Sequence, residues 1–160
     1  MGCTTGATAS VLARSFPDAE IFALDVGGAL LRYAHARAEA LDAGIHFSQQ
    51  TAEHTDFEDG SFDLVVTNAL LHETALQAIH NIMGECHRVL RKGGVMVHAE
   101  QPQFEGMDLF KAFTHDWDSY NNNEPFWGTV HDLDLEELAV GAGFPRAAVF
   151  QTFAPGAAAS

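Results

Sequence analysis

The sequence predicts an α/β protein in which helices cover both faces of a mostly parallel β-sheet. Apolar runs of strand length alternate with stretches of helical periodicity along most of the 160 residues. A small-residue turn over Gly2–Gly6 leads into the first helical stretch, and the acidic Asp25 ends the apolar run that follows. Chains of this class bind ligands where parallel strands end, beside a turn of this kind.

The first part of the chain contributes two helices and two short strands. A helix is expected from the glycine turn to about Ser15, and a strand over Glu20–Asp25. Leucine and alanine recur at helical spacing from Leu30 to Leu41, which predicts a helix over Ala29–Asp42. Ile45–Gln49 is expected as a short strand.

The middle of the chain repeats this pattern. The turn Glu58–Gly60 precedes a strand expected over Ser61–Thr67. Apolar residues at helical spacing predict a helix over Glu73–Leu90, which should end with a left-handed glycine cap in the turn Lys92–Gly94. Val95–Ala99 is expected as the next strand.

The last third begins with an aromatic segment, Phe104–Gly128. The acidic start of Asp134–Gly141 then predicts a helix, and Ala147–Phe153 predicts a last strand. Residues 154–160 are of low complexity and are expected to be disordered. We therefore expect one domain over residues 1–153 and a disordered tail.

Charge and cysteine content restrict the class of partner. Eight basic against 22 acidic side chains give a net charge of −14, which repels the phosphate backbone of a nucleic acid. The dense basic stretch, His87–Lys92, is explained by the dipole at a helix C-terminus. Cys3 and Cys86 form no disulfide framework and indicate a reducing compartment, so the expected location is cytoplasmic.

A membrane and a metal ion are not indicated by the sequence. The chain has no apolar run of about 18 residues, which a membrane-spanning helix requires, and no basic and apolar leader. His80 and His87 are two helical turns apart, too far to hold one ion without other ligands. We therefore expect no membrane partner and no metal.

Several short motifs follow one another along the chain. They are the glycine turn Gly2–Gly6, the strand with its acid Phe16–Asp25, the loop Thr51–Glu53, the strand Phe57–Val65 and the turn His87–Gly94. In this order they resemble the class I S-adenosylmethionine-dependent methyltransferases that act on small molecules. They correspond to that family's glycine loop, second strand with a ribose-binding acid, adenine loop, fourth strand and the turn before the fifth strand.

The resemblance implies a Rossmann-like three-layer sandwich whose sheet has the strand order 3-2-1-4-5-7-6. The first strand of that order would lie between the strands ending at Asp25 and at Thr67, where the chain has only Met1 before its loop. We expect this central strand to be missing, together with the family's final antiparallel strand, which would follow Ala147–Phe153, as in an incomplete reading frame of a longer enzyme. The alternatives are that the neighbouring strands pair directly or that another segment fills the gap, since each unpaired buried group costs about 1–3 kcal/mol.

The resemblance also implies S-adenosylmethionine as the cofactor. The residues expected to hold it are Gly2, Cys3, Gly6, Asp25, Val26, Ala52, Glu53 and Asn68. A carboxylate at a strand end, such as Asp25, can accept hydrogen bonds from both ribose hydroxyls, although it could also cap the following helix. Glycines allow the backbone to approach the methionine moiety, although an ordinary turn uses them too. Glu53 could equally be a solvated loop acid.

Methyl transfer is an in-line displacement from a sulfonium centre, so alignment supplies much of its acceleration. A hydroxyl acceptor also needs a base, and His72, after the fourth strand, is the candidate. The alternative is a histidine packed at a helix start with one hydrogen bond. The residues expected to contact a small-molecule acceptor are His98, Glu100, Trp117, Tyr120 and Trp127. The aromatic segment could instead only pack over the sheet edge.

Two other functions compete with methyl transfer. An NAD(P)-dependent oxidoreductase needs Gly-x-Gly-x-x-Gly, whereas the turn here is Gly-x-x-x-Gly. A non-catalytic, methyltransferase-like fragment that serves as an interaction module would carry the same motifs. The predicted function is transfer of a methyl group from S-adenosylmethionine to a small-molecule acceptor.

Overall fold

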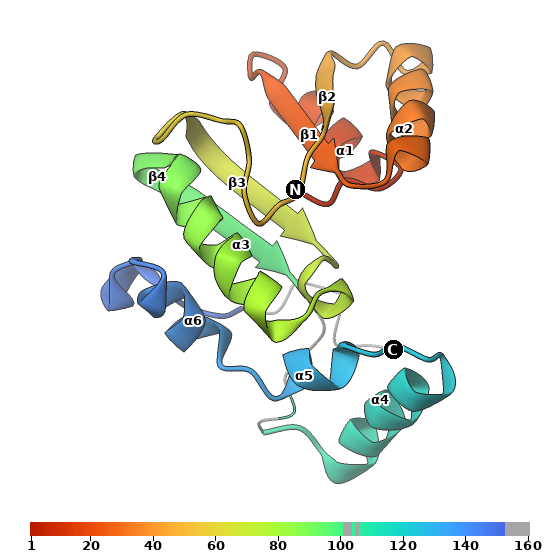
Figure 1. Cartoon of the computed structure of the whole chain (residues 1–160), viewed down its shortest axis with the longest axis vertical. Helices are drawn as coiled ribbons and strands as arrows, with labels where there is room; N and C mark the ends of the chain where they lie inside the picture. The colour runs from red at the N-terminus through yellow and green to blue at the C-terminus, as the bar shows by residue number, and fades with distance from the viewer. Residues whose placement is uncertain (101–103, 105, 153–160) are drawn as a thin grey trace.

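The computed structural model describes residues 1–100, 104 and 106–152 (Figure 1). Its helices and strands alternate over the first 100 residues, and helices follow. In chain order the elements are α1 (Ala7–Ser15), β1 (Ile21–Asp25), α2 (Gly28–Ala40), β2 (Ile45–Gln49), β3 (Phe62–Asn68), the 3-10 turn η1 (Leu71–Glu73), α3 (Leu76–Val89), β4 (Leu90–Ala99), α4 (Leu109–Asn121), α5 (Trp127–His131), α6 (Leu135–Gly141) and the 3-10 turn η2 (Arg146–Ala148).

Both pairs of strands are parallel, as the alternating pattern predicts. β1 pairs with β2 from Ile21 opposite Ile45 to Asp25 opposite Gln49. β3 pairs with β4 in the same sense. Helices α1 and α2 lie beside the first pair, and α3 runs along the second (Figure 1). The α/β class and the Rossmann-like arrangement are therefore confirmed.

The two strand pairs form two separate sheets rather than one continuous sheet. Within the described residues, β1 and β3 are not paired with one another, so the neighbours of the expected central strand have not closed up. The first three residues bridge them instead. The N–H of Cys3 donates to the Leu24 carbonyl at 2.9 Å, and the Met1 ammonium donates to the Val66 carbonyl at 2.7 Å.

The expected glycine cap after the long helix is wrong. Helix α3 begins only at Leu76, after η1, and ends at Val89, before the glycine turn. Leu90 is already extended, with φ −75° and ψ 131°, and pairs with Phe62. Because Leu90 is buried and paired, the chain leaves the helix early, and the left-handed Gly93 lies inside β4 where the register shifts.

The last expected strand is also wrong over its described part. Arg146–Ala148 form the turn η2, and residues 149–152 are not in a strand. A strand exists by pairing, and this segment has no paired neighbour in the described residues. The N–H of Gln151 donates instead to Glu136 Oε1 on α6 at 3.1 Å. Phe153 and the tail 154–160 lie outside the described residues.

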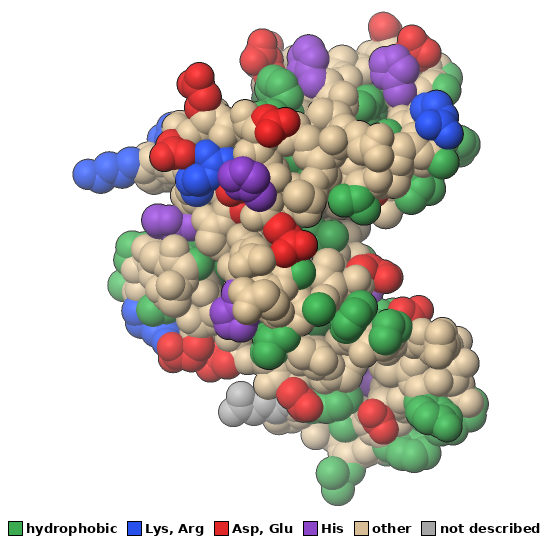
Figure 2. Space-filling view, viewed as in Figure 1, with side chains coloured by type: hydrophobic (Ala, Val, Ile, Leu, Met, Phe, Trp, Pro, Cys, Tyr) green, Lys and Arg blue, Asp and Glu red, His purple; other side chains and the backbone are tan. Residues whose placement is uncertain are grey.

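The core lies between α3 and the second sheet and extends under α5. Ile79, Ile82 and Cys86 on α3 are at most 1% exposed and join a buried cluster with Val65 and Val130. None of the helices within the described ranges is long and apolar enough to cross a bilayer. Acidic side chains are spread over the face shown in Figure 2, and hydrophobic ones gather at its lower end, over α4.

Candidate active site

The glycine turn folds as its composition predicts. Gly2 and Gly6 both have left-handed backbones, with φ +65° and +72°, which favour glycine. A Cβ on Gly2 would lie 2.7 Å from Leu70 Cδ1, and one on Gly6 would lie 3.1 Å from the Ala34 Cβ. Gly6 is also the N-cap of α1. The two glycines therefore leave the backbone free of side chains next to the N-terminus of a helix, where the first N–H groups have no partner within the helix.

The side chain of Asp25 is hydrogen-bonded to this turn. Its side chain stands at the carboxyl end of β1 and the residue is 8% exposed. Oδ2 accepts the N–H of Thr4 and Oδ1 accepts the N–H of Gly27, both at 2.8 Å. It does not cap α2, whose N-cap is Gly27 without a side-chain hydrogen bond. A carboxylate has about four acceptor sites, so two remain for a pair of ribose hydroxyls.

The other expected cofactor residues divide into two groups. Gly2, Cys3 and Asn68 line one cleft, and Asn68 Nδ2 donates to Thr8 Oγ1 at 3.2 Å, which joins the end of β3 to α1. The adenine-side residues lie apart from it. Val26 is 67% exposed, Ala52 is buried in the core, and Glu53 accepts a hydrogen bond from Asn81 on α3 at 2.8 Å.

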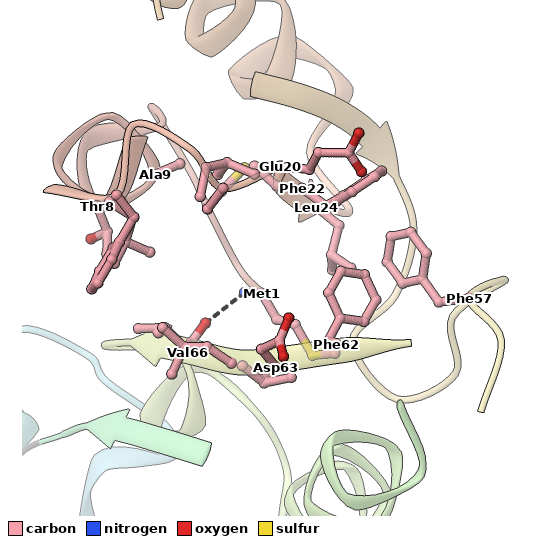
Figure 3. A pocket seen from close by; sticks show the side chains of 18 of the residues that line it. Met1, Thr8, Ala9, Glu20, Phe22, Leu24, Phe57, Phe62, Asp63 and Val66 are labelled. Atoms are coloured by element: carbon pink, nitrogen blue, oxygen red, sulfur yellow. Dashed lines mark hydrogen bonds between the residues drawn. The ribbon is translucent and has the colours of Figure 1, made fainter. Parts of the chain in front are cut away.

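The cleft lies between β1 and β3 and has a volume of about 550 Å³ (Figure 3). Gly2, Cys3 and Asn68 line it near the carboxyl ends of the strands. Towards the amino ends, the rings of Phe22 and Phe62 meet across it edge to face, with centroids 5.6 Å apart. The cleft therefore runs along the flanks of both strands rather than only at their ends.

His72, the candidate base, is buried in η1 and tied to Glu100. Its Nδ1 lies 2.8 Å from Glu100 Oε2, and its Nε2 lies 3.4 Å from Glu73 Oε1. Glu100 Oε1 accepts the N–H groups of Leu70 and Leu71 at 2.8 and 2.6 Å. The structure thus joins two of the expected site residues in one buried network. The one hydrogen bond that His72 Nδ1 makes with Glu100 also agrees with the alternative of a histidine packed at a helix start.

His98 lies beside this network. Its Nδ1 is hydrogen-bonded to Thr67 Oγ1, and its buried Nε2 has no hydrogen-bond partner among the described residues. Burial lowers the pKa of His98 to about 4, although the charge of Glu100 opposes the shift. The ring is therefore neutral at pH 7 and acts as a hydrogen-bonding group rather than a cation.

The three aromatic residues expected to contact the acceptor are not together. Trp127 meets His72 edge on, with ring centroids 5.1 Å apart, and its buried Nε1 lacks a hydrogen-bond partner in the described part of the chain. Trp117 and Tyr120 lie on α4 and are 55% and 85% exposed. The arrangement therefore places His72, His98, Glu100 and Trp127 near one another and leaves Trp117 and Tyr120 outside.

The sequence did not single out several residues that hold this region in place. Thr67 is fully buried beside His98, and the Leu70 and Leu71 backbone anchors Glu100. Alternate residues of β3 point into the core, and this alternation is the only feature of the sequence that could have indicated Thr67. Away from the site, Glu85 accepts hydrogen bonds from Thr55 and Arg88. No group of three or more His, Cys, Asp or Glu within the described ranges is arranged to hold a metal ion.

Known proteins share this fold and these motifs. The model of a family described as methyltransferase domain matches residues 1–94. A ubiquinone/menaquinone biosynthesis C-methyltransferase of Dinoroseobacter shibae is 32% identical over 139 residues, which cover 85% of this chain and 54% of that protein.

Two solved structures show the same fold. A putative methyltransferase of Bacillus halodurans has a TM-score of 0.72 at 22% identity, over 89% of this chain and 60% of that one. A geranyl diphosphate C-methyltransferase of Streptomyces coelicolor, in complex with Mg²⁺, geranyl diphosphate and S-adenosyl-L-homocysteine, has a TM-score of 0.56 at 20% identity, over 61% of this chain and 36% of that one. The chain spans less than two thirds of the length of each of these relatives. With its matching domain and its order of motifs, this chain belongs to the methyltransferase domain family, among the class I S-adenosylmethionine-dependent enzymes.

Proposed function

We propose that this chain binds S-adenosylmethionine and transfers its methyl group to a small-molecule acceptor. The observation that carries the proposal is the hydrogen bond between the glycine turn and Asp25, in which the N–H of Thr4 donates to Asp25 Oδ2 at 2.8 Å. This bond fixes the ribose-binding acid beside the bare backbone of the turn. The residues therefore fit the cofactor at two places, its ribose and its methionine part.

The cofactor supplies an activated methyl group on a sulfonium sulfur. The chain's own contribution is to hold and orient it. The two free acceptor sites of Asp25 take the ribose hydroxyls, and Gly2, which has no side chain, allows its backbone to approach the methionine part of the cofactor closely. Such alignment is the main source of acceleration in an in-line displacement.

His72 is the proposed base. When the acceptor displaced the methyl group, the bonding pair would stay on the sulfonium sulfur as a neutral thioether, and His72 Nε2 would take the acceptor proton. Glu100 supports this role because it accepts a hydrogen bond from Nδ1–H, which leaves the lone pair on Nε2. Trp127 and His98 are the proposed acceptor contacts, since each has a buried nitrogen without a hydrogen-bond partner in the described residues.

Calorimetric titration with S-adenosylhomocysteine and with NADH tests the proposal. We expect the chain to bind S-adenosylhomocysteine and Asp25→Asn to bind it at least about tenfold more weakly, since each charge-assisted hydrogen bond contributes about 1.5–3 kcal/mol. The matched control is Asp116→Asn on the exposed face of α4, which should bind as the unmodified chain does. Binding of NADH alone would support an oxidoreductase instead, and equal binding by Asp25→Asn would remove Asp25 from the site.

A further inference from the structure

The loop between β2 and β3 begins beside the proposed ribose-binding acid. The N–H of Gln50, the residue after β2, donates to the Asp25 carbonyl at 3.1 Å. Parallel strands end at the same edge of a sheet, so residues 51–59 start from the edge at which the Asp25 carboxylate stands. The base of a nucleoside is attached directly to its ribose. Residues 51–59, the base loop, are therefore placed to contact the base of a nucleoside whose ribose is bound by Asp25.

The base loop has little regular structure of its own. Apart from an isolated bridge between Thr51 and His54, residues 51–59 form neither helix nor strand. A segment of this kind keeps one conformation only where other groups satisfy its polar atoms. Side chains of helix α3 supply these hydrogen bonds at successive points of the loop.

Three polar residues of α3 face the base loop. They are Asn81, Glu85 and Arg88, at positions i, i+4 and i+7, and so lie along one side of the helix. Asn81 Nδ2 donates to Glu53 Oε2 at 2.8 Å. Gln77 Nε2 donates to Asn81 Oδ1 at 3.1 Å, so both ends of the Asn81 amide are paired. Because a carboxylate only accepts, this pairing directs the NH2 group of Asn81 to the loop.

The two charged residues bind the middle and the end of the loop. Glu85 Oε1 accepts the N–H and the hydroxyl of Thr55, at 2.7 and 2.5 Å, and the Glu85 side chain is 4% exposed. Arg88 Nε donates to Glu85 Oε2 at 2.9 Å. Arg88 Nη1 donates to the Phe57 carbonyl at 2.8 Å and to Asp59 Oδ1 at 2.6 Å. Successive turns of α3 therefore bind successive parts of the base loop.

We propose that these three residues of α3 are positioning residues for the cofactor: they set where the base loop lies beside Asp25 and thereby favour adenine over other bases. The inference rests on the proposed function. The loop is fixed at its start by Gln50 and farther along by α3, so neither end can shift alone. Hydrogen bonds to the edge of a base depend on distance and angle, and a loop held in one place discriminates more strongly than one that moves.

Calorimetric titration with S-adenosylhomocysteine and with S-inosylhomocysteine tests the inference. The two ligands share their ribose and homocysteine parts. Adenine presents an amino donor and an N1 acceptor, whereas hypoxanthine presents a carbonyl acceptor and an N1–H donor. The measured quantity is the ratio of the two dissociation constants. For the unmodified chain we expect a preference for the adenine ligand of at least about tenfold.

The first variant removes the bond at the start of the base loop. Asn81→Ala should lower the ratio at least about threefold, because Glu53 loses its donor on α3. Asn81→Gln keeps an amide donor and should recover part of the lost selectivity. His80→Ala is the matched control, since His80 is exposed beside Asn81 and its Nδ1 is bonded within α3, to the Leu76 carbonyl. It should keep the ratio of the unmodified chain.

The second variant acts at the end of the base loop. Arg88→Lys keeps a positive charge beside Glu85 but loses the planar fork that reaches Phe57 and Asp59, so it should also lower the ratio at least about threefold. Arg91→Lys makes the same exchange at an exposed arginine outside α3 and should leave the ratio unchanged.

The ratio separates positioning from a purely structural role. An unfolded fraction lowers both affinities equally and therefore cancels in the ratio. Equal weakening of both ligands by Asn81→Ala and Arg88→Lys would overturn the inference, as would a ratio that neither variant changes. If the unmodified chain bound neither ligand, the proposed function would fail and the inference with it. Binding of both ligands with a constant ratio would remove the inference alone.

Discussion

Glu100 holds both the imidazole of His72 and the backbone of the turn that carries it. One carboxylate oxygen lies 2.8 Å from His72 Nδ1, and the other accepts the N–H groups of Leu70 and Leu71. The Glu100 side chain is only 2% exposed. The turn after β3 and the end of β4 are thereby fixed to one another, and the position of the proposed base depends on a single buried acid.

Replacing Glu100 with alanine should lower the free energy of unfolding by about 3 kcal/mol, because it leaves the N–H groups of Leu70 and Leu71 and the Nδ1 of His72 without their acceptor. Urea denaturation measures the change. The matched control is Glu73→Ala, whose exposed carboxylate is the other neighbour of His72 and should contribute less than about 0.5 kcal/mol. Equal losses in the two variants would show that Glu100 is not the anchor of this turn.

Stability in acid should depend on Glu85. Burial alone would raise the pKa of this carboxyl, but hydrogen bonds from Arg88 and Thr55 outweigh it and lower the pKa to about 2, from 4.5. Because the folded value is the lower one, the contribution is complete above pH 4.5 and is lost as the pH falls towards 2. The difference in melting temperature between the unmodified chain and Glu85→Gln should therefore shrink over this range. Glu137→Gln, in an exposed pair with Arg146, serves as the control and should show no such trend.

Two glycine substitutions should act in opposite directions. Gly2→Ala forces a side chain into a left-handed backbone and against Leu70, so it should lower the free energy of unfolding by about 1–2 kcal/mol. Gly84→Ala, inside α3 with open space at its Cβ, should raise it by about 0.5–1 kcal/mol. Urea denaturation of both variants checks the signs. A stabilising Gly2→Ala would contradict the left-handed turn.

His98 should remain neutral well below the pH at which an exposed histidine gains its proton. Burial lowers its pKa to about 4, below the ordinary 6.5, so the unfolded chain binds this proton more readily and stability should fall as the pH drops from 6.5 to 4. NMR titration of the His98 ring resonances measures this directly. A midpoint between pH 6 and 7 would show that the ring is solvated rather than buried.

The local elements could be predicted because each one follows from its own residues. The strand Ile45–Gln49 has the expected bounds, and the acidic start of α6 is confirmed by Asp134, which accepts the N–H of Glu137. The two wrong elements depend on distant partners. Leu90 leaves its helix to pair with Phe62, and the segment after Pro145 pairs with no strand among the residues that the structure describes. Neither relationship is present in the local pattern.

The candidate site shows the same division. The sequence motif predicted that Asp25 ends a strand. Its hydrogen bonds to Thr4 and Gly27, however, depend on how the glycine turn folds against the end of β1. The sequence proposed His72 and Glu100 separately, and their contact joins residues 28 positions apart. It could not indicate which side of α4 faces outward, so it grouped Tyr120 with Trp127 although the structure separates them.

The two sheets are joined at one end by rings rather than by a hydrogen-bond ladder. Phe22 and Phe62 meet edge to face across the cleft. Aromatic edges keep most of their contact when they slide or rotate, whereas ladder bonds are lost when their geometry changes. Asp25 belongs to one sheet and the turn of His72 follows the other. The ribose side and the base side of the site therefore belong to different sheets, and their separation depends on the short segment from Met1 to Cys3, which is hydrogen-bonded to both strands near their carboxyl ends.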